Sequence, residues 1–239
     1  MDSTDLASAR WPELADRPLV VVPLGSLEQH GPHLPLGTYS MVAGAVAAAA
    51  VAGSAGALLA PPLAYGASGE HEGFPGTVSL GTSTLITVLV EYGRSVMRWA
   101  GRLLVVNGHG GNLDALHAAV PLLRYEGRDV AWFACGVPRG DAHAGRTETS
   151  LMLHLAPTTV RPDAAVAGET APLGQLMPQL RTAGVRGVSP NGVLGDPAGA
   201  SAEEGDRLVQ HLVSRAEAAL TRWQVDDTGR LTERPGGSA

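Results

Sequence analysis

The sequence contains no lysine, so all 17 of its basic residues are arginine. This absence excludes Schiff-base chemistry on a lysine amine and phosphate binding by a P-loop lysine. A single cysteine, Cys135, cannot form an internal disulfide, so cysteine usage gives no sign of an oxidising compartment. Aromatic residues make up only 4% of the chain, and alanine, valine and leucine must therefore build the core.

Positive charge and long apolar runs are also scarce. The formal net charge is -6 at pH 7, which argues against nucleic acid or an anionic membrane surface as a partner. The N-terminus lacks the basic and apolar regions of a signal peptide. The stretch 41–60 is nearly uncharged, but its glycines and alanines favour a buried helix and a strand over a membrane span. We therefore expect a cytoplasmic protein.

Hydrophobic residues make up 44% of the 239 residues, enough to form a sizeable core. Apolar, β-branched runs alternate along the chain with segments of helical pattern. We predict strands at 19–24, 57–61, 103–106 and 129–135, and helices at 41–51, 84–100, 113–126 and 202–223. This alternation predicts an α/β fold with a mostly parallel sheet and helices on both faces, in one domain that spans 1–239.

Three local features refine this prediction. Ser83 is expected to cap the second helix, and Ser201 with Glu204 forms a capping-box pattern before the last helix. The region 161–199 is rich in proline and glycine, so we expect it to cover the sheet as irregular structure. Residues 236–239 are expected to form a frayed tail.

Three clusters of polar side chains each follow one of the predicted strands. They comprise Glu28, Gln29, His30 and His33; the segment 107–112, which contains His109; and Asp141, His143 and Glu148. Ligands gather at the carboxyl ends of the strands in a parallel sheet, so we expect these clusters to meet. Carboxylate oxygen and imidazole nitrogen together suit a divalent transition metal. The sequence therefore predicts a metal site at this edge.

Each cluster, taken alone, also fits a structural role. Glu28 could cap a helix, and His30 could be a loop histidine whose hydrogen bonds are satisfied. The glycines of 107–112 could form a tight turn, because glycine tolerates a positive φ. A threonine beside Glu148 could cap a short helix. The metal hypothesis depends on all three clusters falling at comparable positions after their strands.

Four motifs give the sequence a specific resemblance to a known family. They are VVPLGSLEQHGPHLPL, EHEGFPGTVSLG, VVNGHGGN and DAHAGRTETSLML, and they span roughly residues 18–155. Their order and spacing resemble those of the creatininase (creatinine amidohydrolase) family. The resemblance implies a three-layer α/β/α sandwich, a metal-dependent amide hydrolase and a homo-oligomer, often a hexamer. The short, arginine- and alanine-rich chain looks most like a peptidase member that releases a C-terminal dipeptide from a small modified precursor peptide.

The resemblance also implies roles for individual residues. Glu28, His30 and His109 match ligands of the family's two-metal centre, and Glu148 is placed to serve the second metal. His143 matches a histidine that passes a proton to the leaving nitrogen. Zinc is the expected metal, with iron or manganese as alternatives and up to two ions per chain.

The sequence departs from the family at Tyr39, where the family has an aspartate that bridges both metals. A phenol has one oxygen and a pKa of about 10, so it is a weaker ligand than a carboxylate. We therefore expect one of the two metal sites to be weak or partly occupied. Asp141, Glu70 or Glu72 could replace the missing carboxylate.

Two further segments bear on the substrate and on the metal ligands. The backbone N–H groups of Gly110 and Gly111 lie at the predicted start of a helix, where they could hold an oxyanion or a substrate carboxylate. Glu70, His71 and Glu72 could either support the metal ligands or form a solvated loop.

Three functions fit these residues. The first is the metal-dependent peptidase that the resemblance favours. The second keeps the same site but hydrolyses a cyclic amide or a formamide, such as creatinine. The third is a metal-poor protein that only binds a peptide, because Tyr39 has replaced the bridging aspartate.

Overall fold

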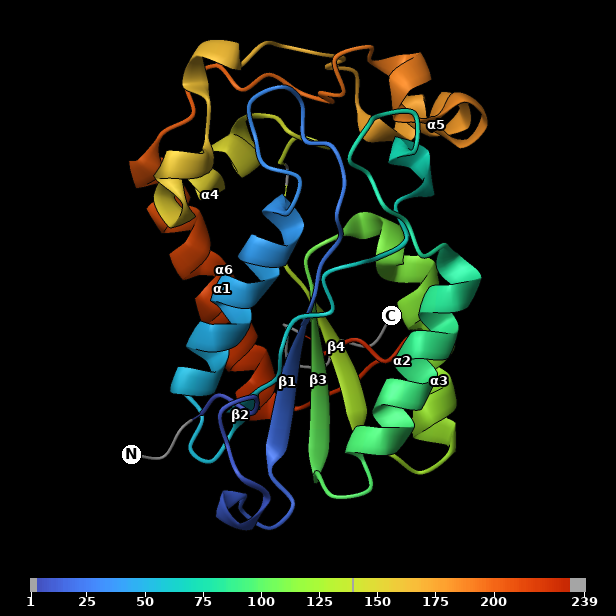
Figure 1. Ribbon diagram of the computed structural model, residues 1–239, viewed down its shortest axis with the longest axis vertical. Coiled ribbons are helices and arrows are strands. Elements are labelled where there is room, and N and C mark those ends of the chain that lie inside the picture. Colours follow the sequence, from blue (N-terminus) through green and yellow to red (C-terminus); the bar gives the residue numbers. More distant parts are fainter. Residues whose placement is uncertain (1–3, 139, 233–239) are drawn as a thin grey trace.

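A parallel sheet forms the centre of the molecule (Figure 1). The computed structural model describes residues 4–138 and 140–232. The strand order is β2-β1-β3-β4, and the strands are β1 (Leu19–Leu24), β2 (Leu58–Leu59), β3 (Arg102–Asn107) and β4 (Val130–Ala134). Leu24 of β1 pairs with Asn107 of β3, which in turn pairs with Ala134 of β4. These three strands therefore end at the same level, and the loops that follow them start side by side.

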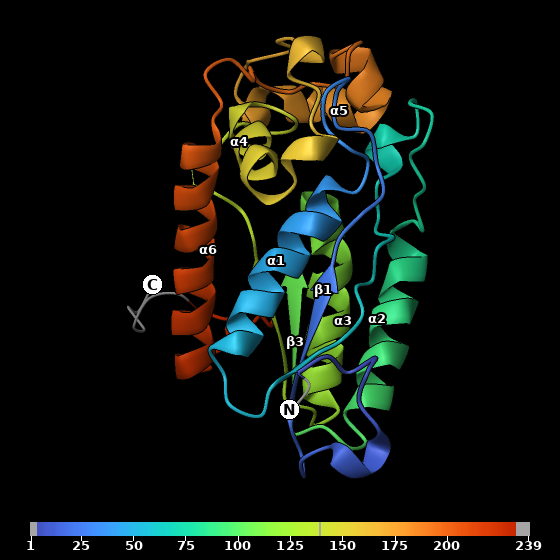
Figure 2. The ribbon, with the colours of Figure 1, turned by 60° about the vertical axis from the view of Figure 1, so that its left-hand side comes forward.

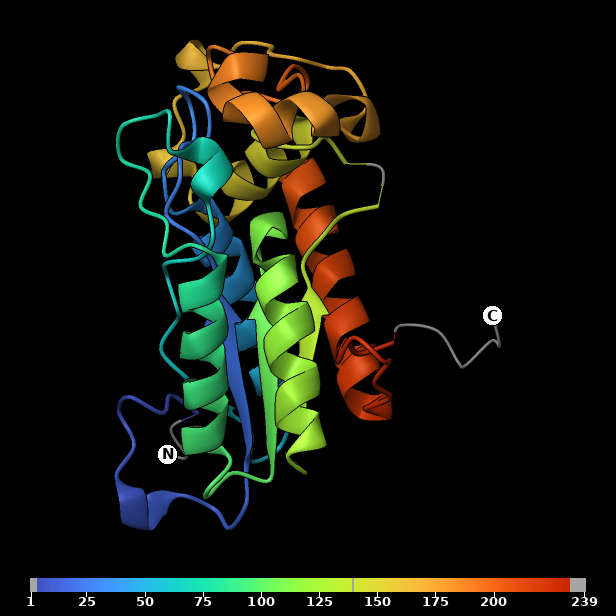
Figure 3. The same ribbon diagram turned by 90° about the vertical axis from the view of Figure 1, so that its right-hand side faces the viewer.

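Helices cover both faces of the sheet, which gives the molecule three layers (Figures 2 and 3). The α-helices are α1 (Thr38–Ala52), α2 (Thr82–Val96), α3 (Leu113–Tyr125), α4 (Arg146–Leu155), α5 (Leu173–Val188) and α6 (Ala202–Arg222). Short 3-10 helices are η1 (Trp11–Glu13), η2 (Gly69–His71), η3 (Gly110–Asn112), η4 (Pro157–Thr159) and η5 (Pro162–Ala164). One face carries α1 and α6, the other carries α2 and α3, and α4 and α5 lie beyond the carboxyl ends of the strands. The predicted α/β/α sandwich is confirmed.

Alternate residues of each strand face opposite layers, as the two-residue period of a strand requires. In β1, Val21 packs in the core with α1 and α6, whereas Val20 and Val22 pack in the core with α2 and α3. In β4, Phe133 and Trp132 divide between the two cores in the same way. Because both faces are buried, the strands appear in the sequence as continuous apolar runs.

The alanine-rich helix α1 carries no charged residue and packs against the sheet, α4 and α6. Its first turn lies close to the end of β3, where a Cβ on Gly108 would be 2.4 Å from the Tyr39 carbonyl oxygen. Glycine at this position therefore allows α1 to bring Tyr39 over the carboxyl edge of the sheet. Among the described residues, no helix has the length and apolar character that crossing a membrane requires.

The predicted cap of the last helix is confirmed in part. The Ser201 side chain accepts a hydrogen bond from the Glu204 N–H at 3.2 Å and so caps α6. The Glu204 carboxylate accepts hydrogen bonds from Arg146 and Ser150 instead of returning to the Ser201 backbone. This carboxylate therefore ties the start of α6 to α4.

The predicted start of the second helix was wrong. Helix α2 begins at Thr82, one residue before the expected cap Ser83, and Gly81 stands at the N-cap position without a side-chain hydrogen bond. The helix also ends at Val96 rather than at residue 100, and β2 is shorter than the predicted strand. Gly81 takes the N-cap position with a φ of 72°, so the helix begins one residue before Ser83. Differences of one or two residues are common at helix ends.

The prediction of irregular structure over 161–199 was wrong in part, because α5 lies within this region, whereas 165–172 and 189–199 are irregular as predicted. Pro178 stands inside this helix, and Gly184 interrupts it with a φ of 63°. Proline and glycine are poor helix formers, so these residues mask the helical pattern in the sequence. Only two residues of α5, Leu176 and Val185, are buried. The expected frayed tail at 236–239 lies outside the described residues.

Phe133 offers a direct test of the sandwich core, because its side chain is completely buried in β4. We expect Phe133→Ala to lower the free energy of unfolding by about 3–5 kcal/mol, since it removes a large apolar side chain and leaves a cavity. Tyr125→Ala is the matched control, because the Tyr125 side chain is 91% exposed. Chemical denaturation of both variants measures this difference, and equal stabilities would contradict the packing described above.

Candidate metal and catalytic site

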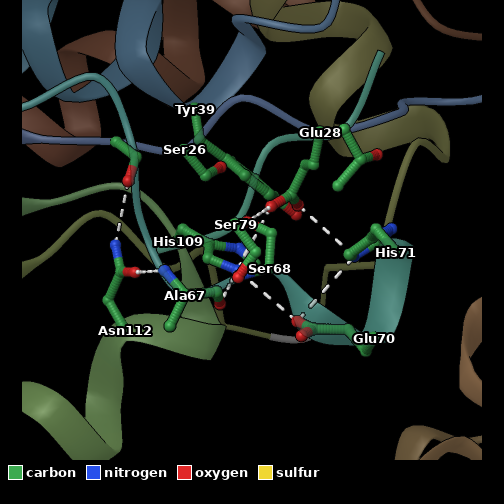
Figure 4. Close-up of polar contacts among 12 residues, drawn as sticks. Ser26, Glu28, Tyr39, Ala67, Ser68, Glu70, His71, Ser79, His109 and Asn112 are labelled. Atoms are coloured by element: carbon green, nitrogen blue, oxygen red, sulfur yellow. Dashed lines mark hydrogen bonds and ion pairs between the residues drawn. The ribbon is translucent and has the colours of Figure 1, made fainter. Parts of the chain in front are cut away.

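The three polar clusters meet at the carboxyl edge of the sheet, part of which is shown in Figure 4. The loop after β1 supplies Glu28 and His30, and the loop after β3 supplies His109. The segment that leads into α4 supplies His143, and α4 itself supplies Glu148. All five side chains are buried.

The loop after β1 is held in a fixed shape by local hydrogen bonds. The Glu28 N–H donates to the Leu36 carbonyl at 3.1 Å, which closes the loop on itself. The Gln29 N–H donates to Thr77 Oγ1 at 3.1 Å, which joins the loop to a distant segment. These bonds satisfy the backbone and turn the Glu28 side chain inward.

Glu28 lies at the centre of the site. Its Oε2 accepts a hydrogen bond from Ser68 Oγ at 2.5 Å and lies 3.2 Å from His109 Nε2. Its Oε1 lies 3.4 Å from His71 Nε2 and has no hydrogen-bond partner among the described residues. Burial raises the pKa of Glu28 even though His109 and Ser68 oppose this shift. A cation beside Oε1 would compensate the buried charge.

His30 presents a free nitrogen to the same space. Its Nδ1 donates to the Glu28 carbonyl at 3.0 Å, which leaves the lone pair on Nε2. Nε2 has no hydrogen-bond partner within the described part of the chain and lies 3.9 Å from Glu148 Oε2. Burial lowers the pKa of His30 well below its ordinary value, so the ring is neutral. A neutral imidazole held in this way is the form that binds metals.

His143 faces Glu28 from the segment before α4. Its Nε2 lies 2.8 Å from the Gln29 carbonyl, the shorter of its two contacts with that residue, and donates there. Its Nδ1 lies 3.1 Å from the Tyr39 hydroxyl and 4.0 Å from Glu28 Oε1. Burial lowers the pKa of His143 to about 3, so Nδ1 carries a lone pair at neutral pH. This nitrogen could accept a proton or bind a cation.

The donor atoms of this centre fit a divalent cation. One ligand atom from each of Glu28, His30 and His143 lies within 4.8 Å of the other two. Two neutral imidazoles and one carboxylate suit zinc, iron or manganese, and two of the donor atoms are buried without hydrogen-bond partners. We refer to these three residues as the Glu28–His30–His143 group.

Tyr39 lies beside this group, at the position where the resemblance implies a bridging aspartate. Its hydroxyl donates to Glu148 Oε1 at 2.6 Å. Burial and the neighbouring Glu148 raise the pKa of Tyr39 well above its ordinary value, so the phenol keeps its proton. Burial raises the pKa of Glu148 to about 7. Tyr39 therefore serves as a hydrogen-bond donor to Glu148 and not as an anionic bridge.

The loop before α4 is shaped by two carboxylates. The Ala144 N–H donates to Glu148 Oε2 at 2.6 Å, and Ala144 adopts a φ of 51°, a conformation that non-glycine residues rarely take. Asp141 accepts hydrogen bonds from the Arg146 N–H at 2.5 Å and from Thr147 Oγ1 at 2.6 Å. Asp141 was grouped with the metal candidates in the sequence, but its oxygens hold this loop instead.

His109 lies between two carboxylates. Its Nε2 is 3.2 Å from Glu28 Oε2 and 3.4 Å from Glu70 Oε1. Burial opposes the charged form of this ring, but the two carboxylates together raise the pKa of His109 above its ordinary value. Without a cation, a proton on Nε2 therefore balances part of the negative charge there.

The sequence left open the role of the segment 70–72, and its three residues differ in position. Glu70 and His71 enter the site from η2, whereas Glu72 is exposed (Figure 4). Gln29 donates through its amide to His71 Nδ1 at 2.9 Å, so His71 Nε2 carries the hydrogen and faces Glu28. His33, which the sequence placed near the metal candidates, contacts Thr149 Oγ1 at 2.9 Å instead.

Gly110 and Gly111 form the start of η3, directly after His109. Their N–H groups belong to the first turn of a helix and lack acceptors within it. A Cβ on Gly111 would lie 2.4 Å from His109 Nε2 and 2.8 Å from Glu70 Oε1. A side chain at this position would therefore enter the space between these two groups.

Buried carboxylate and imidazole donors at the carboxyl edge of a three-layer α/β/α sandwich, with a neutral histidine among them, are typical of a metal-dependent hydrolase. The chain belongs to the creatininase family, because the family model described as creatinine amidohydrolase matches residues 7–220. This confirms the resemblance that the four motifs carried.

Curated relatives narrow the comparison. The chain is 56% identical over 220 residues to the mycofactocin precursor peptide peptidase of Mycolicibacterium smegmatis, covering 90% of this chain and 89% of that protein. It is 50% identical over 238 residues to the peptidase of the same name from Mycobacterium tuberculosis, covering 95% of each. The creatinine amidohydrolase of Pseudomonas putida is 34% identical over 178 residues, covering 62% of this chain and 68% of that protein. These relatives indicate an amide hydrolase, as predicted.

Solved structures agree with this assignment. A mutant creatininase has a TM-score of 0.77 and 28% identity, with 92% of this chain and 99% of that chain covered. Another mutant creatininase, described as Zn-Zn type, has a TM-score of 0.72 over 92% of this chain and 98% of that one. A manganese creatininase has a TM-score of 0.71 over 92% and 99%. These structures and the donor set support a divalent metal in this chain.

Tyr39→Asp tests what the tyrosine does to metal binding. We expect the variant to bind more zinc per chain than the unaltered protein, because a second carboxylate enters the centre with two oxygens and a negative charge. Metal analysis after dialysis against zinc and desalting measures this. Tyr39→Phe is the control, since it removes the hydroxyl without adding a ligand. Two tightly bound ions in the unaltered chain, with no gain in Tyr39→Asp, would contradict the expectation.

Proposed function

We propose that this chain is a metal-dependent peptidase that releases the C-terminal dipeptide from the mycofactocin precursor peptide during maturation of that cofactor. The observation that carries the proposal is the Glu28–His30–His143 group. Its donor atoms are buried at the carboxyl edge of a creatininase fold. The identity of 56% to a precursor peptide peptidase supports the choice of substrate.

Glu28, His30, His109 and Glu148 would hold up to two divalent cations. Zinc is our first choice, with iron or manganese as alternatives, and Tyr39 makes one of the two positions weak. When bound, the cation supplies Lewis acidity at an amide carbonyl and acidifies a water molecule. Carboxylates and neutral imidazoles supply the donors that these metals prefer.

His143 would carry the proton between water and the leaving nitrogen. Its Nε2–H is fixed on the Gln29 carbonyl, so its lone pair is on Nδ1, which faces the centre. A neutral imidazole first accepts a proton there and then donates it to the amine that leaves. General acid–base catalysis of this kind contributes about 10²–10⁴-fold to a rate.

Gly110 and Gly111 would bind either the oxyanion or the C-terminal carboxylate of the substrate. Their N–H groups point from the start of a helix, where negative charge is stabilised. Binding the terminal carboxylate there would set the distance from the end of the peptide to the bond that is cut. A dipeptide product follows from such a fixed distance.

We further propose a cytoplasmic homo-oligomer, resembling a hexamer, with no nucleic-acid or membrane partner. The family resemblance supports the oligomer, and the net charge of -6 supports the absence of an anionic partner. In solution, the proposal requires a mass several times that of the 24.5 kDa chain.

A synthetic precursor peptide tests the proposed activity. We expect the purified chain, supplied with zinc, to shorten the peptide by its two C-terminal residues, and a chelator to abolish this. Mass spectrometry of the products measures both. A peptide amidated at its C-terminus is the matched control and should react much more slowly, since it lacks the carboxylate that the Gly110–Gly111 turn would bind. Cleavage of creatinine but not of the peptide would favour the cyclic-amide function, and peptide binding without cleavage would favour the metal-poor protein.

His143→Ala distinguishes proton transfer from metal binding by this histidine. We expect kcat to fall by about 10²–10⁴-fold while the metal content stays nearly unchanged. Although His143 Nδ1 lies close enough to Glu28 and His30 to bind a cation, the proposal uses this nitrogen for the proton and leaves the cations to Glu28, His30, His109 and Glu148. Glu28→Ala and His109→Ala should instead lose metal and activity together. If His143→Ala loses as much metal as these two variants, His143 is a ligand and its assigned role is wrong.

A further inference from the structure

Glu70 brings a second carboxylate to the side of Glu28 that faces His109 (Figure 4). Three oxygens surround His109 Nε2: Glu28 Oε2 at 3.2 Å, Glu70 Oε1 at 3.4 Å and the Ala67 carbonyl at 3.1 Å. One N–H proton cannot satisfy three acceptors at once. The acceptors therefore exceed what a protonated histidine supplies, and two of them carry negative charge.

The two distances from His109 to the carboxylates match the spacing between ligands of one cation. Oxygen and nitrogen ligands about 2.0–2.2 Å from zinc in a tetrahedron lie roughly 3.3–3.6 Å apart. The distances from His109 Nε2 to Glu28 Oε2 and Glu70 Oε1 are 3.2 and 3.4 Å. Two carboxylates and a neutral imidazole would also balance the charge of a divalent cation, and the Glu28 side chain is fully buried.

Glycine at position 111 leaves the room that the Glu70 carboxylate occupies. A Cβ at this position would lie 2.8 Å from Glu70 Oε1 and 2.4 Å from His109 Nε2. Any larger side chain there would displace Glu70 from His109. The NGHGG motif thus allows a carboxylate from a different segment to reach the histidine.

Helix α5 holds the segment that carries Glu70. The kink at Gly184 approaches the backbone of η2 so closely that a Cβ there would lie 2.9 Å from the Glu70 carbonyl oxygen. Arg186 donates to the Gly73 carbonyl at 2.6 Å and lies over the Phe74 ring. The position of Glu70 is therefore set by packing on both sides.

Other acidic residues near the centre are less suited to replace the missing bridging carboxylate. Asp141 is engaged with the backbone before α4, and Glu72 is exposed. Both oxygens of Glu148 already accept hydrogen bonds, from Tyr39 and Ala144. Glu70 is the carboxylate that already lies against His109.

We propose that Glu70 is a metal ligand, which together with Glu28 and His109 binds one divalent cation beside the Glu28–His30–His143 group. This proposal rests on the metal dependence in the proposed function and adds a ligand to it. His71 would orient the site, because its protonated Nε2 lies 3.4 Å from Glu28 Oε1 and 3.9 Å from Glu70 Oε1.

Zinc titration of Glu70→Gln tests the proposal, with Glu72→Gln as the matched control two residues away. The full chain is stripped of metal and titrated with zinc against a chromophoric chelator, and bound zinc is counted after desalting. We expect Glu70→Gln to weaken binding of the tightest zinc ion at least about tenfold and Glu72→Gln to bind like the unaltered chain. Cobalt substitution provides a second readout, because removing a ligand changes its visible absorption spectrum.

A different outcome would show that Glu70 only pairs with protonated His109. In that case, Glu70→Gln would change the melting temperature of the metal-free protein but leave zinc affinity, stoichiometry and the cobalt spectrum unaltered, and the proposal would be overturned. The test is independent of the substrate. Weaker zinc binding by Glu70→Gln supports Glu70 as a ligand even if the unaltered chain fails to cleave the peptide. If Glu70→Gln binds zinc normally and still cleaves the peptide, Glu70 is not a ligand but the proposed function stands.

Discussion

The buried carboxylate of Glu28 is the constraint on which the site depends. Removing a carboxylate from water costs several kcal/mol unless hydrogen bonds or opposite charges compensate it. Ser68 and His109 compensate Oε2, and both come from segments far from Glu28 in the sequence. Oε1 keeps no hydrogen bond among the described residues, so the fold brings a charge to the end of β1 and leaves part of it for a ligand to satisfy.

The residues of the site come from two parts of the fold, the loops that follow the strands and the region of α4. Glu28 and His109 lie in the loops that follow β1 and β3, and the register of the sheet brings the starts of these loops side by side. His143 and Glu148 belong to α4 and the segment before it, which pack on α6 and α1 outside the sheet. Candidate metal donors therefore come both from loops that follow the sheet and from α4, which is anchored in the core by Leu151 and Met152.

The sequence predicted the layers, the parallel sheet and the convergence of Glu28, His30 and His109, because buried strands are continuous apolar runs and their ends meet. It did not predict α5, where Pro178 and Gly184 interrupt the pattern. It also left Glu70 undecided, since its place beside His109 depends on that same helix. Long-range contacts of this kind have no local signal, and the EHEGFPGT motif was the only indication that the segment had a function.

At position 39, the residue that is more favourable without a bound cation differs from the one that binds a cation better. The Tyr39 hydroxyl donates to Glu148, and this hydrogen bond opposes the rise in the pKa of Glu148 that burial causes. An aspartate there would place a second negative charge beside Glu148 and Glu28, which destabilises the fold until a cation binds. With a cation bound, the aspartate becomes the better residue because it adds charge and a second oxygen. A tyrosine at this position therefore satisfies Glu148 without adding charge, whereas an aspartate would need a cation to compensate it.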